Sequence, residues 1–392
     1  MTVTFGLIYS YSEFFIPFHN QFGWDHTVDS TIPAVAIVIF SVGCPIAAYL
    51  ISRFGTRSVS VAGGLLVGSG AILSSAINSY LQLLVLFGVV VAFGAAIAVL
   101  LSNTLSVRWF VKRRGIAVGI AASGSGIGTL VVPPLAGYLI LSMGWRSTLL
   151  ILGAAFLVIL LIASYFMQTP EDRATTPYGW ENLSTSERSE YRNYTLRQAV
   201  SSASFWMLFS MFFLGTFAMT MFVVHSVPLA ASEGIGVLSA SLALGLFGAG
   251  SLFARVVIGA LSDQLGGAKG LIVAFSIELV GMALVVFVNG NALLLYLASF
   301  SIGFGFGGFL ADLVGLTGDV FGTKHIEKIW GWITIGYGLG GLLGPVFGGA
   351  YFDRYGSYVG AFGVGAGVAA GAPLIATYFA IRVQSKIPNA LR

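Results

Sequence analysis

The chain contains 392 residues, of which 57% are hydrophobic and only 9% are charged. Soluble domains carry about 25% charged residues, because charged side chains cover the surface of a protein that folds in water. So little charge excludes an ordinary soluble domain. It predicts that lipid surrounds most of the chain.

Twelve apolar runs are each close to the roughly 20 residues that a helix needs to cross the hydrocarbon layer. An open strand cannot satisfy its backbone groups in lipid, so we predict an all-α membrane protein with twelve transmembrane helices. In chain order, these helices are expected at residues 1–18, 31–52, 59–77, 81–107, 116–141, 147–167, 204–226, 238–261, 268–289, 292–318, 330–352 and 357–382.

The positions of Lys and Arg predict the orientation, because positively charged loops stay in the cytoplasm. With the N-terminus inside, every Lys and Arg falls on the cytoplasmic side except Arg146, Arg255 and Arg354. We therefore expect a multi-pass protein of the cell (plasma) membrane with both termini in the cytoplasm. This asymmetry also accounts for the pI of 9.1, so no nucleic-acid partner is needed to explain it.

Cys44 is the only cysteine, which excludes an intramolecular disulfide and a thiolate metal cluster. The four histidines are scattered, and no nucleophile stands at a readable spacing from a base. We therefore expect no enzyme activity, no metal and no cofactor. The functional unit is expected to be a monomer.

The two halves of the chain resemble each other at one constant displacement of 211 residues. Pro17 and Gly23 correspond to Pro228 and Gly234, Leu50 and Gly55 to Leu261 and Gly266, Phe110 to Phe321, and Pro134 and Gly137 to Pro345 and Gly348. The repeat predicts two pseudo-symmetric six-helix bundles, an arrangement in which transporters bind substrate near mid-membrane between the halves. We place the bundles at residues 1–167 and 204–392, and we interpret the polar stretch 168–203 as a cytoplasmic linker.

The same alignment predicts that the native chain starts upstream of Met1. The seventh helix begins near Phe205, and the matching position of the first half would precede Met1. The first helix is then short by about two turns, at 3.6 residues per turn.

A short motif recurs after the second and the eighth helix. Residues 48–57 contain Arg53, Gly55 and Arg57, and the repeat partner at 259–266 contains Asp263 and Gly266. Small residues allow close helix packing, glycine permits a sharp turn, and the charge can bind a neighbouring helix end. The pair resembles the signature loops of the major facilitator superfamily, although Ser52 stands where that family usually has Asp. The alternative interpretation is two ordinary turns.

Arg255 lies inside a predicted helix, about two turns from its cytoplasmic end. Burying a charge there costs roughly 2.5–3.5 kcal/mol even on the mildest scale, so the guanidinium should face a wet cavity or an anion. Its fork of donors matches a carboxylate better than Lys would. The alternatives are a structural pair with an intramembrane acid such as Asp312, or snorkelling to the interface.

Three acids lie within predicted helices. Asp312 and Glu13 are candidates for proton coupling, because a desolvated carboxyl can load and release protons near neutral pH; packing roles are equally open. For Glu278 we favour packing, because the ninth helix is peripheral in the superfamily that the chain resembles.

Other polar and aromatic residues are weaker candidates for substrate binding. Asn103 could donate to a substrate carboxylate or bond between helices. Phe306 and Tyr337 lie in glycine-rich stretches and could line a cavity or simply pack. No strand precedes these glycines, so a nucleotide-binding loop is excluded.

Several segments together narrow the resemblance further. They are Phe5–Tyr11 with Phe14 and Phe15, Arg108–Gly119, Gly144–Arg146, Phe253–Arg255 and Asp312–Gly315. Across essentially the whole chain, the sequence is similar to the monocarboxylate transporter family and its oxalate/formate antiporter relatives. This resemblance implies that Arg255 is the substrate-binding arginine and that lactate- or pyruvate-like anions are the substrates.

Two departures limit this implication. Proton-coupled members of the family have an acid one turn before the arginine, where this chain has Ser251, and a Lys in the first helix, where this chain has none. The dicarboxylate antiporters place a second cation in the eleventh helix, but residues 330–352 contain no Lys or Arg. Without a second cation in the eleventh helix, a substrate with a single carboxylate is favoured over a dicarboxylate.

We therefore expect a secondary active transporter that moves a small organic anion across the lipid bilayer by alternating access, with a proton as co-substrate. The alternatives are an anion exchanger of the oxalate/formate type and a non-transporting membrane sensor with a transporter fold.

Overall fold

A computed structural model describes residues 1–23, 26–182 and 193–383. Within these residues the regular structure is helical, apart from an isolated bridge between Phe110 and Tyr178. Ten helices are long and apolar enough to cross a membrane. One of them, α7, contains two of the predicted spans, and α1 with α2 forms the first span. The predicted all-α fold of twelve spans is confirmed.

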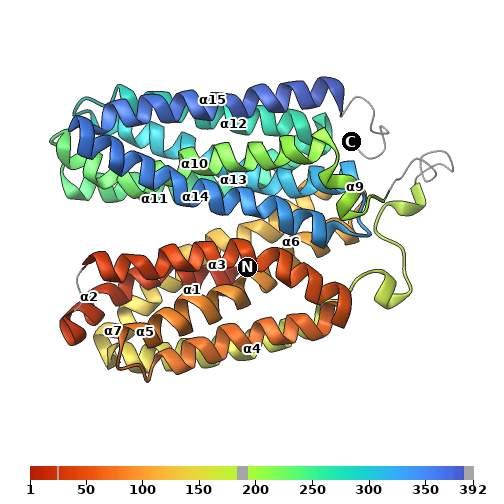
Figure 1. Ribbon diagram of the computed structural model, residues 1–392, viewed down its shortest axis with the longest axis horizontal. Coiled ribbons are helices and arrows are strands. Elements are labelled where there is room, and N and C mark those ends of the chain that lie inside the picture. Colours follow the sequence, from red (N-terminus) through yellow and green to blue (C-terminus); the bar gives the residue numbers. More distant parts are fainter. Residues whose placement is uncertain (24–25, 183–192, 384–392) are drawn as a thin grey trace. The chain divides into compact units, whose positions relative to one another are not determined.

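The chain divides into two compact units (Figure 1). The first combines Met1–Leu105 with Gly124–Thr175, and the second combines Ser106–Ser123 with Thr176–Arg392. The second unit therefore includes the loop between α6 and α7, which packs on α11 and α14 through contacts described below. The bundle boundaries predicted from the repeat stay a prediction.

The first unit contains the first six spans. Its helices are α1 (Thr2–Tyr9), α2 (Tyr11–Phe22), α3 (His26–Phe54), α4 (Thr56–Ser74), a continuous run of α5 (Tyr80–Leu83), the π-helix η1 (Leu84–Val91) and α6 (Ala92–Trp109), and α7 (Arg114–Phe166). The run from α5 begins at a capping box, in which Ser79 accepts from the Gln82 amide and the Gln82 side chain accepts from the Ser79 amide.

The first span is interrupted, whereas the sequence predicted one continuous helix over 1–18. The break lies at Ser10, whose hydroxyl donates to the Gly6 carbonyl oxygen at 2.6 Å. The end of α1 nearer Met1 packs tightly on α7, because a Cβ on Gly128 would lie 2.1 Å from the Thr2 carbonyl oxygen. Small residues of this kind let two helix backbones approach in lipid.

Helix α7 turns at Gly144, where the backbone leaves helical geometry with φ 82°. The sequence placed this turn between the predicted helices 116–141 and 147–167. Next to it, Trp145 packs edge-on against Phe18 with ring centroids 5.0 Å apart, and its indole N–H donates to Gln21 at 2.6 Å. The turn is thereby joined to the end of α2.

Repeat-related glycines adopt the same backbone conformation. Gly23 and Gly234 have φ of 65° and 73°, and Gly55 and Gly266 have φ of 82° and 91°. L-residues with a side chain rarely adopt this region, so glycine is needed at each turn. The internal repeat therefore extends from sequence to backbone geometry.

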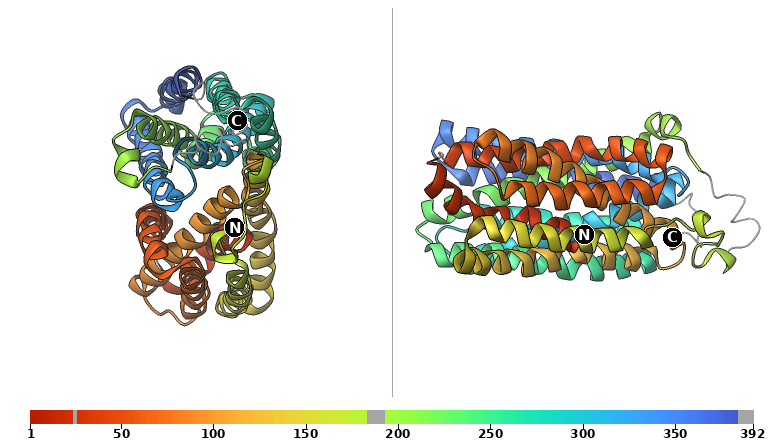
Figure 2. Two further views of the ribbon diagram at one scale, coloured as in Figure 1. Left: turned by 90° about the vertical axis from the view of Figure 1, so that its right-hand side faces the viewer. Right: turned by 90° about the horizontal axis from the view of Figure 1, so that it is seen from below.

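The second unit contains the last six spans, and its long helices run side by side along one direction (Figure 2). Their bounds are α10 (Ala203–Ser232), α11 (Val237–Leu265), α12 (Gly267–Val286), α13 (Ala292–Phe321), α14 (Ile326–Tyr355) and α15 (Tyr358–Arg382). Side chains of Ser202, Asn291 and Ser357 cap the starts of α10, α13 and α15. Ahead of α10 lie the short helices η2 (Glu171–Arg173), η3 (Trp180–Asn182) and α9 (Leu196–Val200).

Glycines of α13 permit close contact with α11 on one side and α12 on another. A Cβ on Gly303 would lie 2.0 Å from the Phe247 carbonyl oxygen, and one on Gly307 would lie 2.1 Å from that of Ser251. On the other side, a Cβ on Gly305 would lie 2.4 Å from the Cβ of Glu278. The glycine-rich stretch of α13 is thus a packing surface for both neighbouring helices.

Candidate functional site

Arg255 is buried in α11, with 4% of the residue exposed. Its Nη1 donates to the carbonyl oxygen of Ala122 in α7 at 2.7 Å. A carbonyl oxygen accepts a hydrogen bond but carries no net charge, so this contact orients the guanidinium without neutralising it. One turn earlier on α7, Gly119 lies directly against the Arg255 backbone.

Asp263 of the second signature loop lies at the N-terminus of α7. Its Oδ1 accepts from the Gly115 amide at 2.7 Å and its Oδ2 from the Ile116 amide at 3.0 Å. The first amides of a helix have no partner within the helix and carry partial positive charge, so a carboxylate there acts as a cap. Because a Cβ on Gly115 would lie 2.3 Å from the Gly259 carbonyl oxygen, glycine is what allows the two helices to meet here.

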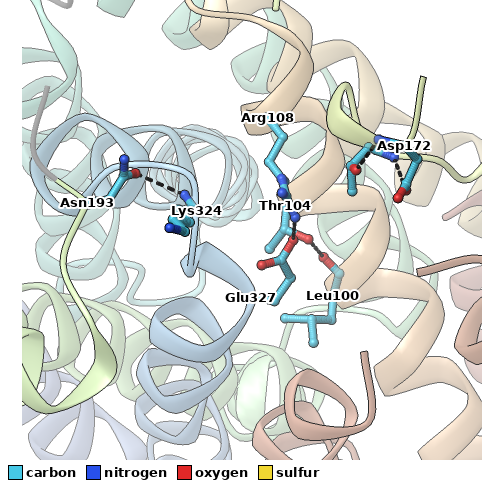
Figure 3. A network of polar contacts seen from close by, with 8 residues as sticks. Leu100, Thr104, Arg108, Asp172, Asn193, Lys324 and Glu327 are labelled. Atoms are coloured by element: carbon cyan, nitrogen blue, oxygen red, sulfur yellow. Dashed lines mark hydrogen bonds and ion pairs between the residues drawn. The ribbon is translucent and has the colours of Figure 1, made fainter. Parts of the chain in front are cut away.

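Two ion pairs lie next to this cap. Figure 3 shows the ion pair between Arg108 and Glu327. Their Nη1 and Oε1 atoms are 2.8 Å apart, and the side chains are 13% and 7% exposed. Arg114 pairs with Asp319, and its Nε also donates to the Phe110 carbonyl oxygen at 2.9 Å. Together these residues form a polar junction between the α6–α7 loop and the ends of α13 and α14, which we call the loop junction.

The sequence interpretation missed the loop junction, because it used Arg108 and Arg114 to assign orientation and to recognise the family resemblance but gave them no partners. A signal was present, since Arg108 and Asp319 are repeat partners of opposite charge. Repeat-related loops with complementary charges can attract each other, although the repeat alone does not show which residues meet. Burial, and after it the neighbouring Lys324 and Lys328 charges, lower the pKa of His325, which lies between α13 and α14.

Asp312 is 2% exposed and accepts a hydrogen bond from the Ser262 hydroxyl. The close approach of α12 makes room for this contact, because a Cβ on Gly270 would overlap both side chains. Among the described contacts, the Asp312 carboxyl bonds to Ser262 and not to Arg255. The structural pair of Asp312 with Arg255, which the sequence left open, is therefore not seen in the described residues. Asp312 lies beside the second signature loop instead.

Phe306 and Tyr337 belong to an aromatic cluster of the second unit. Phe306 is 6% exposed and stacks on Phe247 with centroids 5.9 Å apart. Tyr337 is partly buried and lies 5.4 Å from Phe212, which also stacks on Trp330 at 5.3 Å. These contacts hold both candidate residues in place, and their contribution to substrate binding stays a prediction.

The remaining predicted residues belong to the first unit. Asn103 of α6 is buried, with 6% of the residue exposed. Glu13 is exposed at the start of α2, and its Oε2 would lie 3.2 Å from a Cβ on Gly137 of α7. In the first signature loop, Arg53 lies over Phe54 and Arg57 over Tyr165, with guanidinium carbons 5.4 and 4.6 Å from the ring centres.

Two other buried polar residues, His225 and Glu278, contact neighbouring helices. His225 of α10 shares a hydrogen bond with the Pro345 carbonyl oxygen at 2.8 Å. Glu278 of α12 is 1% exposed, and its Oε1 has no hydrogen-bond partner among the described residues. It packs against the glycine face of α13.

A twelve-span helical fold with a repeated signature loop is that of a multi-pass membrane transporter of small molecules. The chain belongs to the Major Facilitator Superfamily, whose family model matches residues 1–277 and, in a second match, residues 226–391. The predicted superfamily is thereby confirmed, and with it the class of a transporter rather than an enzyme.

The chain is similar to several curated transporters. It is 28% identical to an uncharacterised superfamily transporter of Escherichia coli (strain K12), YhjX, over 77% of this chain and 73% of that protein. It is 27% identical to human monocarboxylate transporter 11, over 92% of this chain and 76% of the relative. With rat monocarboxylate transporter 13 it shares 26% identity over 95% of this chain and 84% of the relative. The predicted relation to monocarboxylate transporters is confirmed.

Solved structures show the same fold. The superfamily transporter FucP in its outward conformation matches with a TM-score of 0.68 at 16% identity, covering 96% of this chain and 97% of that chain. A second structure, of the E. coli fucose:proton symporter FucP, matches with a TM-score of 0.70 at 16% identity, covering 96% of each chain. At this identity the likeness concerns the fold.

Proposed function

We propose that this protein carries a small monocarboxylate across the cell membrane by alternating access, and that Arg255 binds the substrate carboxylate. The observation that carries the proposal is a guanidinium buried inside a membrane span, where its Nη1 donates to the Ala122 carbonyl oxygen. A cation in such a place is costly unless an anion accompanies it. A carboxylate would accompany it while the substrate is bound.

The neighbouring contacts support this assignment. The hydrogen bond to Ala122 uses one guanidinium nitrogen and holds the planar group in one orientation. Arginine has five donors in a fixed fork, a geometry that matches both oxygens of a carboxylate. The similarity to monocarboxylate transporters points to the same substrate class.

We further propose that a proton travels with the anion, so that the cycle moves no net charge, and that Asp312 or Glu13 carries it. Asp312 is buried beside the second signature loop, where protonation would remove a charge next to Ser262. Glu13 is exposed within the first span. In this proposal the functional unit is a monomer, and both termini lie in the cytoplasm.

Transport by the purified protein in liposomes tests the proposal. We expect uptake of radiolabelled lactate or pyruvate to be lost in Arg255→Gln and partly retained in Arg255→Lys, which keeps the charge but not the fork. Arg382→Gln, an exposed arginine at the end of α15, is the matched control. An Arg255→Gln protein that folds and still carries these anions would refute the site.

The same liposomes separate proton symport from its alternatives. Uptake driven by an inwardly directed proton gradient, and reduced in Asp312→Asn or Glu13→Gln, would support coupling. Uptake that needs an internal counter-anion would identify an exchanger of the oxalate/formate type. A folded protein without any flux would identify a sensor that retains the transporter fold.

A further inference from the structure

The linker between the two sets of spans is attached to the α6–α7 loop near its first end and to the α13–α14 loop near its second end. At its first end, the Tyr178 amide donates to the Trp109 carbonyl oxygen at 2.8 Å. The Tyr178 carbonyl oxygen accepts from the Val111 amide at 3.0 Å and from the Lys112 amide at 3.3 Å. The Tyr178 ring lies 5.9 Å from that of Phe110.

The adjoining glycine fits this attachment closely. Gly179 has φ 87°, and a Cβ there would lie 2.5 Å from the Cβ of Lys112. Residues with a side chain avoid this backbone region, and the space is also missing. The linker can therefore lie on the α6–α7 loop only with glycine at this position.

At its second end, the linker is attached to the α13–α14 loop. The Tyr194 amide donates to the Phe321 carbonyl oxygen at 2.9 Å, and the two rings meet edge to face at 5.5 Å. The Asn193 side chain accepts from the Lys324 amide, a contact drawn in Figure 3, and the two atoms are 3.1 Å apart. Immediately afterwards, the Thr195 capping box starts α9 and leads into α10.

The two attachments are related by the internal repeat. Phe110 and Phe321 are repeat partners, and each meets a tyrosine of the linker through a ring contact beside a hydrogen bond from the tyrosine amide. Neither tyrosine belongs to the repeat itself. A passive tether would not need a matched pair of contacts at equivalent positions of the two halves.

We propose that Tyr178 and Tyr194 are positioning residues of the transporter: each docks one end of the linker onto the equivalent loop of its own half and so aligns the charges of the loop junction. Arg108 at the end of α6 and Arg114 at the start of α7 flank the α6–α7 loop, and Asp319 and Glu327 flank the α13–α14 loop in the same way. Each docked end follows its own half, so both stay docked while the halves rock.

Crosslinking tests whether the ends stay docked, and its yield does not depend on which substrate is carried. The experiment uses a Cys44→Ser background and two cysteine pairs, Phe110→Cys with Tyr178→Cys and Phe321→Cys with Tyr194→Cys. Each pair is joined in membranes by a short, reducible, thiol-reactive crosslinker. Both pairs should crosslink, because the backbone hydrogen bonds beside them remain. Since the cysteines remove the ring contacts, transport should be slow before crosslinking, as in the alanine variants below, and should rise when the crosslink fixes the docked ends. Crosslinked protein that stops transporting, and recovers on reduction, would overturn the proposal.

Substitution of the tyrosines tests the positioning role. We expect Tyr178→Ala and Tyr194→Ala to lower the maximal rate per folded protein about three- to tenfold, with little change in KM, because neither residue touches Arg255. Phe at either position keeps the ring and should restore the rate. Gly179→Ala should also lower the crosslinking yield at Tyr178, whereas Thr176→Ala, at an exposed linker position, should match the parent protein.

These outcomes separate the inference from the proposed function, on which its transport readout rests. If no monocarboxylate is carried, the crosslinking yields still report docking. If the anions are carried but both alanine variants transport at the parent rate, the linker is a passive tether and the positioning role is refuted.

Discussion

Gly119 of α7 lies against the backbone of Arg255 so closely that a Cβ at Gly119 would fall 2.2 Å from the Arg255 carbonyl oxygen. The obstructing atom belongs to the main chain of α11, so no side-chain rotation can relieve the overlap. The residue proposed to bind the substrate is therefore held at a point where two helix backbones touch.

The first prediction concerns this contact. Gly119→Ala should destabilise the folded protein by about 1–3 kcal/mol or more, because α7 and α11 must separate to admit the methyl group. Gly245→Ala is the matched control on α11, since a Cβ there meets nothing within 4 Å. Alanine is favoured over glycine in a helix, so the control should be neutral or stabilising by about 0.5–1 kcal/mol. Thermal unfolding in detergent measures both, and equal midpoints would contradict the packing.

The second prediction uses the repeat as its own control. Asp263→Ala removes both acceptors for the Gly115 and Ile116 amides and should cost about 0.5–2 kcal/mol, the usual value of a helix cap. Its repeat partner Ser52 is exposed and donates to the Tyr49 carbonyl oxygen of its own helix at 2.8 Å. Ser52→Ala should therefore change stability by less than about 0.5 kcal/mol. A larger loss at Ser52 than at Asp263 would contradict the described geometry.

The third prediction is a double-mutant cycle at Arg108 and Glu327. Removing either side chain leaves the other charge in a largely buried place, and each single alanine variant should lose about 3 kcal/mol, the lower end for a buried pair. The double variant should be more stable than the sum of the two losses predicts, because it leaves no orphaned charge. Denaturation of the four proteins measures the coupling. Strict additivity would mean that the pair contributes nothing.

The fourth prediction concerns Glu278. Its Oε1 lacks a hydrogen-bond partner among the described residues, and an apolar group of similar volume removes that cost. Glu278→Leu should therefore raise the thermal midpoint, by an amount equivalent to about 1 kcal/mol, and should leave transport unchanged. Glu278→Gln, which stays polar, should remain close to the parent protein. Loss of transport in the folded leucine variant would give this acid a functional role instead of a packing role.

The sequence predicted the spans because each depends on composition over a window of about 20 residues. It was less exact where local geometry decides. Helix α4 covers Thr56–Ser74 rather than the predicted 59–77. The turn is made at Gly55, which has φ 82°, so the helix begins at the next residue, three positions before the apolar run starts. The break at Ser10 was not visible either, because a serine in an apolar run does not reveal where its hydroxyl will bond.

The site was predictable only in part. Arg255 and Asp263 stood out because their charges break apolar helices or recur with the repeat. Their partners did not, because Ala122 and Gly115 contribute main-chain atoms from more than a hundred positions away. The Asp312 contact shows the same limit, since the sequence offered a charged partner and the structure provides the Ser262 hydroxyl. The loop junction needed the fold, because its charges are ordinary for cytoplasmic loops.

Both hydrogen bonds that Asp263 makes with α7 end on backbone amides, and Arg255 Nη1 donates to the backbone carbonyl oxygen of Ala122. Every amino acid other than proline supplies such atoms, so these three contacts restrict the facing helix by bulk and not by functional group. Substitutions in α7 that keep the residues facing α11 small should therefore be tolerated among homologues. Segment exchange between distant members of the superfamily should succeed here more often than at the neighbouring ion pairs, which require matched partners.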